Sequence, residues 1–375
     1  MRRLRMAMIG GGPGSFIGPV HRIAAELDRE IELVAGVFSS DPGRSRAAAD
    51  IYRMDPARAY PDLTTMLSAE RQRADAADFV AIVTPNHDHL PSARAALAAG
   101  FAVMSDKPMT ATLEEAHALN AAVAAAGLPY ALTYTYSGYP LVREARARVA
   151  AGTLGAVRKV VVEYPQGWLA GPATGKQAEW RVDPARAGAG GCIGDIGVHA
   201  FHLAEFVTGL KVTELLADLG TVVPGRLLDD DCSVLLRFED VGFGAARGVL
   251  LASQIEVGEL NGLSIRVYGE QGGLVWRQET PNELTLHHLD GRTEIVRAGT
   301  AALGPDAARR TRTPGGHPEG YLEAFANLYR DFAEVLRGGS APLLPGAADG
   351  LRSMAFIDTA VRASASGTGW TALTV

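Results

Sequence analysis

A cluster of glycines near the start of the chain constrains its fold more than any other feature. A short apolar run precedes the cluster and a helical pattern follows it, and its members are Gly10, Gly11, Gly12, Gly14 and Gly18. A strand, a glycine turn and a helix present backbone N–H groups and a helix N-terminus to a pyrophosphate. The order therefore predicts a dinucleotide-binding loop, although a plain glycine-rich turn is the alternative.

The spacing of these glycines departs from the usual fingerprint. In G-x-G-x-x-G, Gly10 and Gly12 fit the first two places, but the third falls on Ser15. The next glycine that can pack a helix against the strand is Gly18, three residues later. The sequence thus predicts a loop longer than the standard one.

Strand and helix patterns alternate along the first third of the chain. Such alternation predicts βαβ units and a doubly wound parallel sheet. The expected strands are Arg5–Ile9, Ile31–Phe38, Phe79–Val83, Phe101–Met104 and Tyr130–Thr133, and the expected helices are His21–Leu27, Ser45–Tyr52, Pro91–Ala99 and Leu113–Ala126.

After a helix at Leu141–Ala150 the pattern becomes rich in strands, interrupted by one helix at Asp195–Thr208. This predicts a second α/β domain with a large, mostly antiparallel open sheet. The expected domains are 1–135, a Rossmann dinucleotide-binding domain, and 136–375, for substrate binding and oligomerisation, with the C-terminal helices as candidates to pack back on the first. The expected strands are 157–164, 214–223, 232–238, 245–254, 263–268, 273–277 and 283–288, the late helices are Tyr321–Leu336 and Ala347–Ala363, and long loops are expected at Gly171–Gly190 and Gly299–Pro318.

The composition excludes several classes of protein. A formal charge of −6 from 36 basic and 42 acidic residues gives no footprint for nucleic acid or an anionic membrane. The two cysteines, Cys192 and Cys232, exclude a disulfide framework and fit a reducing compartment. No stretch approaches the roughly 20 apolar residues of a membrane helix. We therefore expect a cytoplasmic protein that binds neither nucleic acid nor membrane.

The end of the second expected strand bears on the choice between NAD and NADP. Binders of NAD usually carry an acid there, which bonds the ribose 2′-OH. Here the strand ends in Ser39 and Ser40, and with nearby Arg44 their hydroxyls suit a 2′-phosphate, which favours NADP. Asp41 keeps NAD as the alternative, and a plain turn is the structural reading of the two serines.

Three polar segments stand where chemistry is expected. Thr84-Pro85-Asn86-His87-Asp88-His89 and Asp106-Lys107-Pro108 follow strands, at the carboxyl edge where open α/β sheets bind ligands. The third segment, Gly190 to His199, opens a helix. Asp195 and His199 are four residues apart there, so they share one face, and His202 lies on the same side.

Together these segments resemble the Gfo/Idh/MocA family of sugar and inositol oxidoreductases over nearly the whole length. The resemblance rests on the glycine loop, the T-P-N-x-x-H stretch, the family's E-K-P motif and a D-x-G-x-H helix. It implies a Rossmann domain, a second domain whose open sheet forms a homodimer or homotetramer, and a catalytic group of Lys107, Asp195 and His199. Two departures are Asp106 in place of the motif's Glu and His202 where an acid is often found.

The chemistry of these side chains agrees with the resemblance. Oxidation of a secondary alcohol needs a base for the hydroxyl proton, and the pKa of histidine, about 6.5, suits His199 to that role. Asp195 is placed to orient the imidazole or to bond a neighbouring hydroxyl, and the Lys107 cation to stabilise an alkoxide. Taken singly, each has a structural reading: an exposed turn lysine, a helix cap and a buried histidine.

The remaining candidates fall into two sets. For the cofactor we expect contacts from residues at the ends of the first four strands: Gly10, Gly12, Pro13, Gly14, Ser15, Phe16, Ile17, Ser39, Ser40, Arg44, Thr84, Pro85, Asn86, His89, Asp106 and Lys107. For the substrate we expect Lys107, Asp195 and His199 with aromatic and polar residues near the cleft, a mixture that suits sugars. The latter are Tyr136, Tyr139, Tyr164, Gln166, Trp168, Lys176, Trp180, Arg181 and His317.

A dehydrogenase of a sugar, glycoside or cyclic polyol is the leading hypothesis, and three others stay open. A glycoside hydrolase or lyase with tightly held NAD would oxidise its substrate transiently. A non-catalytic sugar-sensing regulator on the same fold would lack the catalytic residues that are present here. A zinc site would use Cys192, Asp195, His199 and His202, but we expect no metal because the family reading explains two of these residues without one.

Overall fold

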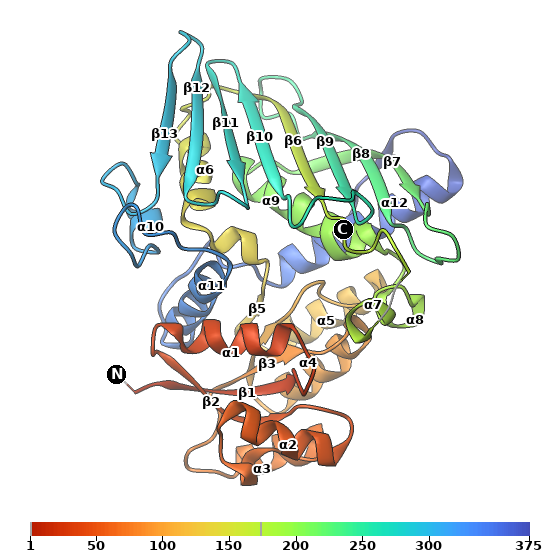
Figure 1. Ribbon diagram of the computed structural model, residues 1–375, viewed down its shortest axis with the longest axis vertical. Helices are drawn as coiled ribbons and strands as arrows, with labels where there is room; N and C mark the ends of the chain where they lie inside the picture. Colours follow the sequence, from red (N-terminus) through yellow and green to blue (C-terminus); the bar gives the residue numbers. More distant parts are fainter. Residues whose placement is uncertain (1, 173–174) are drawn as a thin grey trace. The chain divides into compact units, whose positions relative to one another are not determined.

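The computed structural model describes residues 2–172 and 175–375, apart from the side chains of residues 176 and 177. The chain divides into two compact units (Figure 1). The first comprises Met1–Tyr134 and Phe325–Met354, and the second Thr135–Ala324 and Ala355–Val375. Each unit is built on one sheet.

The first unit contains a five-stranded sheet in which every strand pair is parallel, in the order β2-β1-β3-β4-β5. All five residues of β3 are buried, as expected for a parallel strand covered on both faces. The predicted Rossmann arrangement is confirmed. The strands are β1 (Leu4–Gly10), β2 (Ile31–Val37), β3 (Phe79–Val83), β4 (Ala102–Ser105) and β5 (Tyr130–Leu132).

Helices connect these strands, and local sequence sets where several of them begin. Asp41 accepts the Arg44 N–H at the start of α2, and Thr112 and Glu115 form a capping box at the start of α5. The helices are α1 (Ile17–Leu27), α2 (Pro42–Tyr52), α3 (Leu63–Arg71), α4 (His89–Ala98) and α5 (Leu113–Ala126), with the short 3-10 turns η1 (Pro56–Arg58) and η2 (Asn86–Asp88). Helix α3 was not predicted. Asp62 caps it.

The second unit contains a nine-stranded sheet in the order β13-β12-β11-β10-β6-β9-β8-β7-β14, and Figure 1 labels the strands from β13 to β7 in this order. Only β6 and β9 pair in parallel, so the prediction of a mostly antiparallel sheet is confirmed. The strands are β6 (Val157–Pro165), β7 (Val212–Gly220), β8 (Asp231–Phe238), β9 (Arg247–Ser253), β10 (Ser264–Gly269), β11 (Gly272–Arg277), β12 (Glu283–His288), β13 (Thr293–Arg297) and β14 (Thr371–Ala372), of which β13 and β14 were not predicted.

One face of this sheet is covered by helices. Helices α6 (Pro140–Ala150) and α9 (Val198–Thr208) pack on it, and Phe356 of α12 (Ala347–Ser366) stacks on Phe201 of α9 at a centroid distance of 4.2 Å. In β8, Val234 and Leu236 are buried while Leu235 between them is 43 % exposed. This alternation is the pattern of a sheet with one covered and one open face.

The two stretches expected as long loops contain short helices. Helices α7 (Lys176–Glu179) and α8 (Pro184–Ala187) lie in the first, and α10 (Pro305–Ala308) in the second. In α8, Asp183 accepts the Ala185 N–H and Pro184 occupies the first turn. A capping acid and an early proline favour a helical turn even in a glycine-rich stretch. The prediction of an uninterrupted loop was therefore wrong at these residues. The remaining elements are η3 (Thr135–Gly138), η4 (Ile193–Gly197) and α11 (Tyr321–Leu336).

A search for membrane spans finds no helix long and apolar enough to cross a bilayer within the described ranges.

The core of the first unit contains a buried histidine, His21 of α1. Its Nδ1 lies 2.7 Å from the hydroxyl of Tyr329, and its ring meets Phe325 edge-on. Burial lowers the pKa of His21 from 6.5 to about 4. The neutral imidazole is therefore the form that the folded unit holds.

The free energy of unfolding is expected to depend on pH through His21. Below pH 6.5 the His21 side chain is protonated in the unfolded chain, but in the folded chain it stays neutral until about pH 4. The free energy of unfolding therefore decreases as the pH falls. Over this window the loss is about 3 kcal/mol. Chemical denaturation of wild type and His21→Phe at pH 7 and pH 4.5 measures the difference between the two slopes.

The pH dependence of wild type must be compared with that of His21→Phe, because a second group changes the free energy of unfolding in the opposite direction. Burial raises the pKa of Asp229 in the second unit from 3.8 to about 6, so its contribution to stability is lost as the pH rises through that window. Equal pH dependence in wild type and His21→Phe would contradict the assignment to His21.

Candidate active site

The glycine loop of the first unit joins β1 to α1. Gly10 and Gly11 have φ of 89° and 76°, which glycine adopts without strain. At Gly12 an added Cβ would lie 2.1 Å from the carbonyl oxygen of Phe38, the residue after β2. The loop therefore runs against the ends of two strands so closely that a side chain at Gly12 would displace it.

Gly18 explains the unusual length of the loop. An added Cβ at Gly18 would lie 2.4 Å from the Cα of Gly11, so the first turn of α1 packs directly on the loop. The hydroxyl of Tyr52, from α2, lies close to Gly18 as well and donates to the carbonyl of Gly11. Close packing of helix and loop is the part that the third glycine plays in the standard fingerprint. Here Gly18 plays it from three residues further along.

The residues between Gly12 and Gly18 form the tip of the loop. The Ser15 N–H donates to the Gly12 carbonyl at 2.9 Å, and the Ser15 hydroxyl accepts the Gly18 N–H at 3.2 Å. Gly14 has a φ of 80° with no atom within 4 Å of an added Cβ, and Phe16 is 60 % exposed. The Pro13 carbonyl accepts a hydrogen bond from the Arg44 guanidinium at 3.3 Å. Helix α1 begins at Ile17. The tip thus leaves open space beside its backbone.

The end of β2 lies beside this tip. Arg44 is exposed, and Ser40 is exposed as well. The Ser39 hydroxyl accepts the Asp41 N–H at 3.2 Å, and one Asp41 carboxylate oxygen accepts the Arg44 N–H at 2.7 Å. Asp41 is therefore engaged as the cap of α2.

The carboxyl ends of β3 and β4 carry the next two predicted segments. Thr84 and Pro85 follow β3, and Asn86 is buried at the start of η2. After β4, Asp106 accepts the Thr133 hydroxyl at 2.7 Å and the Lys107 N–H at 2.9 Å. Lys107 is half-buried, and the peptide bond between it and Pro108 is cis.

His89 joins these two segments. Its ring is fully buried, with Nδ1 2.8 Å from the carbonyl oxygen of Pro108 and Nε2 2.9 Å from that of Thr84. Both ring nitrogens thus face backbone carbonyls of the two loops. The contact that the structure shows for His89 is this one, and its predicted contact with a cofactor stays a prediction.

In the second unit, Asp195 and His199 lie where η4 passes into α9. Segment η4 is a π-helical turn, in which the Val198 N–H bonds to the Ile193 carbonyl five residues back. Single π turns inside helices are frequent at functional sites. The Asp195 Oδ2 accepts the Arg181 Nε–H at 3.1 Å and the Gln254 amide at 3.0 Å.

Arg181 is held by aromatic rings as well as by Asp195. Its guanidinium carbon lies 4.4 Å from the ring centroid of Trp180 and 5.9 Å from that of Trp168. Arg181, Trp168 and Trp180, three predicted substrate residues, are thus brought together beside Asp195. Trp168 remains 47 % exposed.

A hydrogen-bonded series of polar groups lies beside His199. The His199 ring meets the Tyr136 ring edge-on at 4.9 Å, and the Tyr136 and Tyr164 hydroxyls bond each other. Tyr164 donates to the Asn261 side-chain oxygen at 2.6 Å, and the Gln166 amide donates to the same oxygen at 2.9 Å. Trp168 extends the series by donating to the side-chain oxygen of Gln166 at 2.9 Å.

Burial determines the charge state of three tyrosines in this part of the second unit. It raises the pKa of Tyr136 and that of Tyr139, and it raises the pKa of Tyr164 well above its ordinary value. The three phenols are therefore neutral near pH 7. They present hydroxyls and ring faces rather than charge.

Three functional candidates were missed by the sequence analysis. Gln254 is buried just after β9 and bonds Asp195, Asn261 joins Tyr164 to Gln166, and Asp229 bonds the segment before Asp195. All three lie in connections between strands, and none belongs to a motif with a fixed spacing. Their one signal is a polar residue next to a strand end.

Other predicted residues lie apart from this series. His317 is exposed in a turn, where its Nδ1 lies 3.2 Å from the Pro314 carbonyl. His202 is buried in α9 and stacks on Phe206. The Lys176 side chain lies outside the described residues. Across the described ranges, no group of three or more His, Cys, Asp or Glu side chains is placed to hold a metal ion.

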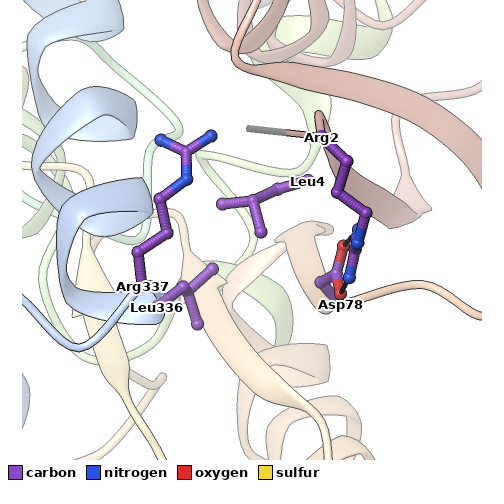
Figure 2. A pocket seen from close by; sticks show the side chains of 5 residues that line it. All are labelled: Arg2, Leu4, Asp78, Leu336 and Arg337. Atoms are coloured by element: carbon purple, nitrogen blue, oxygen red, sulfur yellow. Dashed lines mark hydrogen bonds and ion pairs between the residues drawn. The ribbon is translucent and has the colours of Figure 1, made fainter.

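Figure 2 shows a pocket of about 410 Å³ elsewhere in the first unit. Arg2, Leu4, Asp78, Leu336 and Arg337 line it, and the Arg2 guanidinium lies on the Asp78 carboxylate at 2.5 and 2.6 Å. Leu4 and Asp78 stand at the amino ends of β1 and β3. Because ligands of open α/β sheets bind at the carboxyl ends, this pocket does not belong to the candidate site.

Comparison with protein families gives two matches. Residues 4–134 match the oxidoreductase family with an NAD-binding Rossmann fold, and residues 142–275 match the GFO/IDH/MocA C-terminal domain. Among curated proteins, the chain is 32 % identical to the uncharacterized oxidoreductase YfiI of Bacillus subtilis, across 98 % of this chain and 96 % of that one.

Two solved structures are similar over almost the full length. An oxidoreductase from Sinorhizobium meliloti is 42 % identical with a TM-score of 0.91, covering 99 % of this chain and 100 % of that one. An inositol dehydrogenase homolog from Azotobacter vinelandii, complexed with NADH and myo-inositol, is 33 % identical with a TM-score of 0.92, covering 99 % and 98 %. The chain therefore belongs to the Gfo/Idh/MocA family of oxidoreductases, with an NAD-binding Rossmann fold in its first part.

Proposed function

We propose that the chain transfers a hydride between a secondary alcohol of a sugar, glycoside or cyclic polyol and a nicotinamide cofactor. The observation that carries this proposal is the arrangement around Asp195 and His199. One oxygen of the Asp195 carboxylate accepts bonds from Arg181 and Gln254. The His199 ring meets the ring of Tyr136, whose hydroxyl belongs to the hydrogen-bonded series of neutral hydroxyls and amides. Such a set of uncharged donors and acceptors beside an aspartate and a histidine suits a polyhydroxylated substrate.

The proposal gives a role to each of the side chains of His199, Asp195 and Lys107. His199 takes the proton of the reacting hydroxyl and returns it in the reverse reaction. Asp195, fixed by its two donors, orients a neighbouring hydroxyl or the imidazole, and the Lys107 ammonium stabilises the alkoxide as it forms. When bound, the nicotinamide cofactor supplies the hydride acceptor or donor.

The glycine loop fits a dinucleotide in its sterics. Added Cβ atoms at Gly10, Gly11 and Gly12 would all lie 3.0 Å or less from neighbouring atoms, so the backbone runs bare along the carboxyl end of β1. We infer that this backbone and the start of α1 hold the pyrophosphate. Thr84, Pro85, Asn86, Asp106 and Lys107 follow the next two strands and are proposed to line the nicotinamide end.

We propose Tyr136, Gln166, Trp168, Trp180 and Arg181 as substrate contacts. The aromatic rings offer faces for the C–H groups of a sugar ring, and the amide and guanidinium offer hydrogen bonds. The similar A. vinelandii protein was solved with myo-inositol, a substrate of this chemical type. His317 is retained as a proposed contact on the sequence argument alone.

The choice between NAD and NADP depends on the end of β2. Ser39, Ser40 and Arg44 form the group that favours a 2′-phosphate, whereas the A. vinelandii relative was solved with NADH. We propose that the two hydroxyls and the exposed guanidinium favour NADP over NAD. The ratio of kcat/KM for NADP and NAD on one substrate measures this preference directly, and a ratio well below one would overturn it.

The proposed function is tested by a substrate panel. Purified protein is incubated with inositols, aldoses and anhydrosugars, each with NAD and with NADP, and reduced cofactor is followed by its absorbance. We expect one group of polyols to be oxidised with either cofactor. No absorbance change with any member would count against the proposal, and product without net NADH would favour a hydrolase or lyase.

The open face of the nine-stranded sheet carries a row of aliphatic side chains. Leu216, Leu235, Val249 and Val161 are register partners across β7, β8, β9 and β6, so they line up on one face. None of the four is buried, and Leu235 is the most exposed. An exposed apolar row of this length is typical of an interface between subunits.

We propose that this face joins subunits into a homodimer or homotetramer. Sedimentation of wild type should give a multiple of the 39.5 kDa chain mass, and Leu235→Asp should shift it towards the monomer. Ile51→Asp is the matched control, because Ile51 is similarly exposed on α2 of the first unit. A monomeric wild type would contradict the assignment.

A further inference from the structure

Asp229 bonds the chain just ahead of the Asp195–His199 helix. It lies in the connection between β7 and β8. Its Oδ1 accepts the Gly191 N–H at 2.6 Å and its Oδ2 accepts the Ile193 N–H at 2.7 Å. Its backbone carbonyl accepts the Cys192 N–H at 2.8 Å. One aspartate therefore takes three consecutive backbone donors of the segment that leads into η4.

The contact is also tight in its packing. An added Cβ at Gly191 would lie 2.2 Å from the Asp229 carbonyl oxygen, so a glycine is required for the two segments to approach. The Gly191 carbonyl in turn accepts the Asp195 N–H at 2.9 Å. The clamp formed by Asp229 on residues 191–193 is thus one hydrogen bond away from the backbone of Asp195.

The next residue, Asp230, holds a second partner of Asp195. Its carbonyl accepts the Gln254 N–H at 2.9 Å, and the Gln254 side chain donates to Asp195 Oδ2 at 3.0 Å. The Asp230 carboxylate accepts the N–H groups of Val222 and Val223 and pairs with Arg226. The connection between β7 and β8 therefore reaches Asp195 by two separate routes.

We propose that Asp229, as a carboxylate, is a positioning residue that sets the orientation of Asp195 and His199 for proton transfer. This role rests on the proposed function. A carboxylate is the group that accepts from two converging N–H donors at once, whereas a carboxamide has one accepting oxygen and turns its NH2 towards the other donor. A misplacement of about 1 Å in a catalytic group lowers turnover by about 100-fold.

The test is a split between turnover and cofactor binding. In Asp229→Asn we expect kcat to fall by about 10- to 100-fold, while the dissociation constant of NADH changes less than twofold, because the proposed cofactor residues lie in the first unit. Asp231→Asn is the matched control: it removes a carboxylate two residues away that starts β8. It should keep both values near those of wild type.

Hydrogen exchange gives a readout that does not depend on turnover. In wild type the amides of Gly191 and Ile193 should be protected from exchange, and in Asp229→Asn this protection should fall at least about tenfold while the core strands stay protected. Because the wild-type measurement needs no variant, it decides the clamp even if Asp229→Asn fails to fold.

The outcomes separate the two proposals. Unprotected amides at 191 and 193 in wild type, or a kcat of Asp229→Asn within twofold of wild type, would overturn the positioning role. Equal losses of kcat, NADH binding and core protection would also overturn it, since they indicate general damage. A wild type that turns over no polyol while the two amides are protected overturns the proposed function and leaves the clamp standing.

Discussion

His199→Asn is expected to lower kcat by about 10²- to 10⁴-fold, the contribution typical of general acid–base catalysis. The asparagine side chain is too weak a base to take a proton at pH 7, although it fills much of the same space in α9. The dissociation constant of NADH should stay within about twofold, because the glycine loop belongs to the first unit. Stopped or continuous absorbance assays on the best substrate of the panel measure the change.

His202→Asn is the matched control for this prediction. His202 lies on the same helix with the same 8 % exposure as His199, and it stacks on Phe206 instead of meeting Tyr136. Its loss should disturb the packing of α9 to a similar degree and lower kcat far less. Equal losses in the two variants would show that packing of α9, and not the His199 base, governs the rate.

Gly12→Ala is expected to weaken NADH binding by about 100-fold or more, or close to 3 kcal/mol. The added Cβ would lie 2.1 Å from the Phe38 carbonyl oxygen, and both atoms belong to backbone or its first carbon, so the loop itself must move. Moving the loop misaligns the N–H groups proposed to hold the pyrophosphate. Titration of NADH by its fluorescence measures the affinity.

Gly14→Ala is the control within the same loop. No atom lies within 4 Å of an added Cβ there, but the φ of 80° costs an alanine about 1 kcal/mol of strain. We therefore expect a loss of stability with a much smaller loss of affinity. If Gly12→Ala binds NADH as wild type does, the loop is not the cofactor site.

The sequence predicted the elements whose pattern is long and regular. The buried strand Phe79–Val83 and the capped helix Leu113–Ala126 were placed with the bounds that the structure gives. Helix α3 was missed because Leu63–Arg71 is only nine residues long, which leaves little room for a repeating apolar pattern. Strand β13 was missed because it is a five-residue edge strand with only two apolar residues, Ile295 and Val296, which are adjacent and so give no alternation.

Steric relations between distant glycines were beyond sequence reasoning. The spacing showed that Gly18 comes late for the fingerprint, but its contact with Gly11 depends on how α1 leaves the loop. In the same way, the bonds of Asp229 to the amides of Gly191 and Ile193 join residues 38 and 36 positions apart, respectively. Any residue except proline has a backbone N–H group, so the sequence pattern cannot indicate which of these groups an aspartate such as Asp229 will bond.

The cap at Asp41 restricts how this enzyme can change its cofactor. Its carboxylate starts α2, and replacing such a cap costs about 1 kcal/mol of stability. An evolutionary path that alters the charge at the end of β2 through Asp41 must therefore cross a less stable intermediate. The side chains of Ser39, Ser40 and Arg44 do not cap α2, although the Ser39 hydroxyl accepts the Asp41 N–H and the Arg44 guanidinium donates to the Pro13 carbonyl. Exchanging these three side chains would therefore leave the cap of α2 in place while changing the residues proposed to select the cofactor.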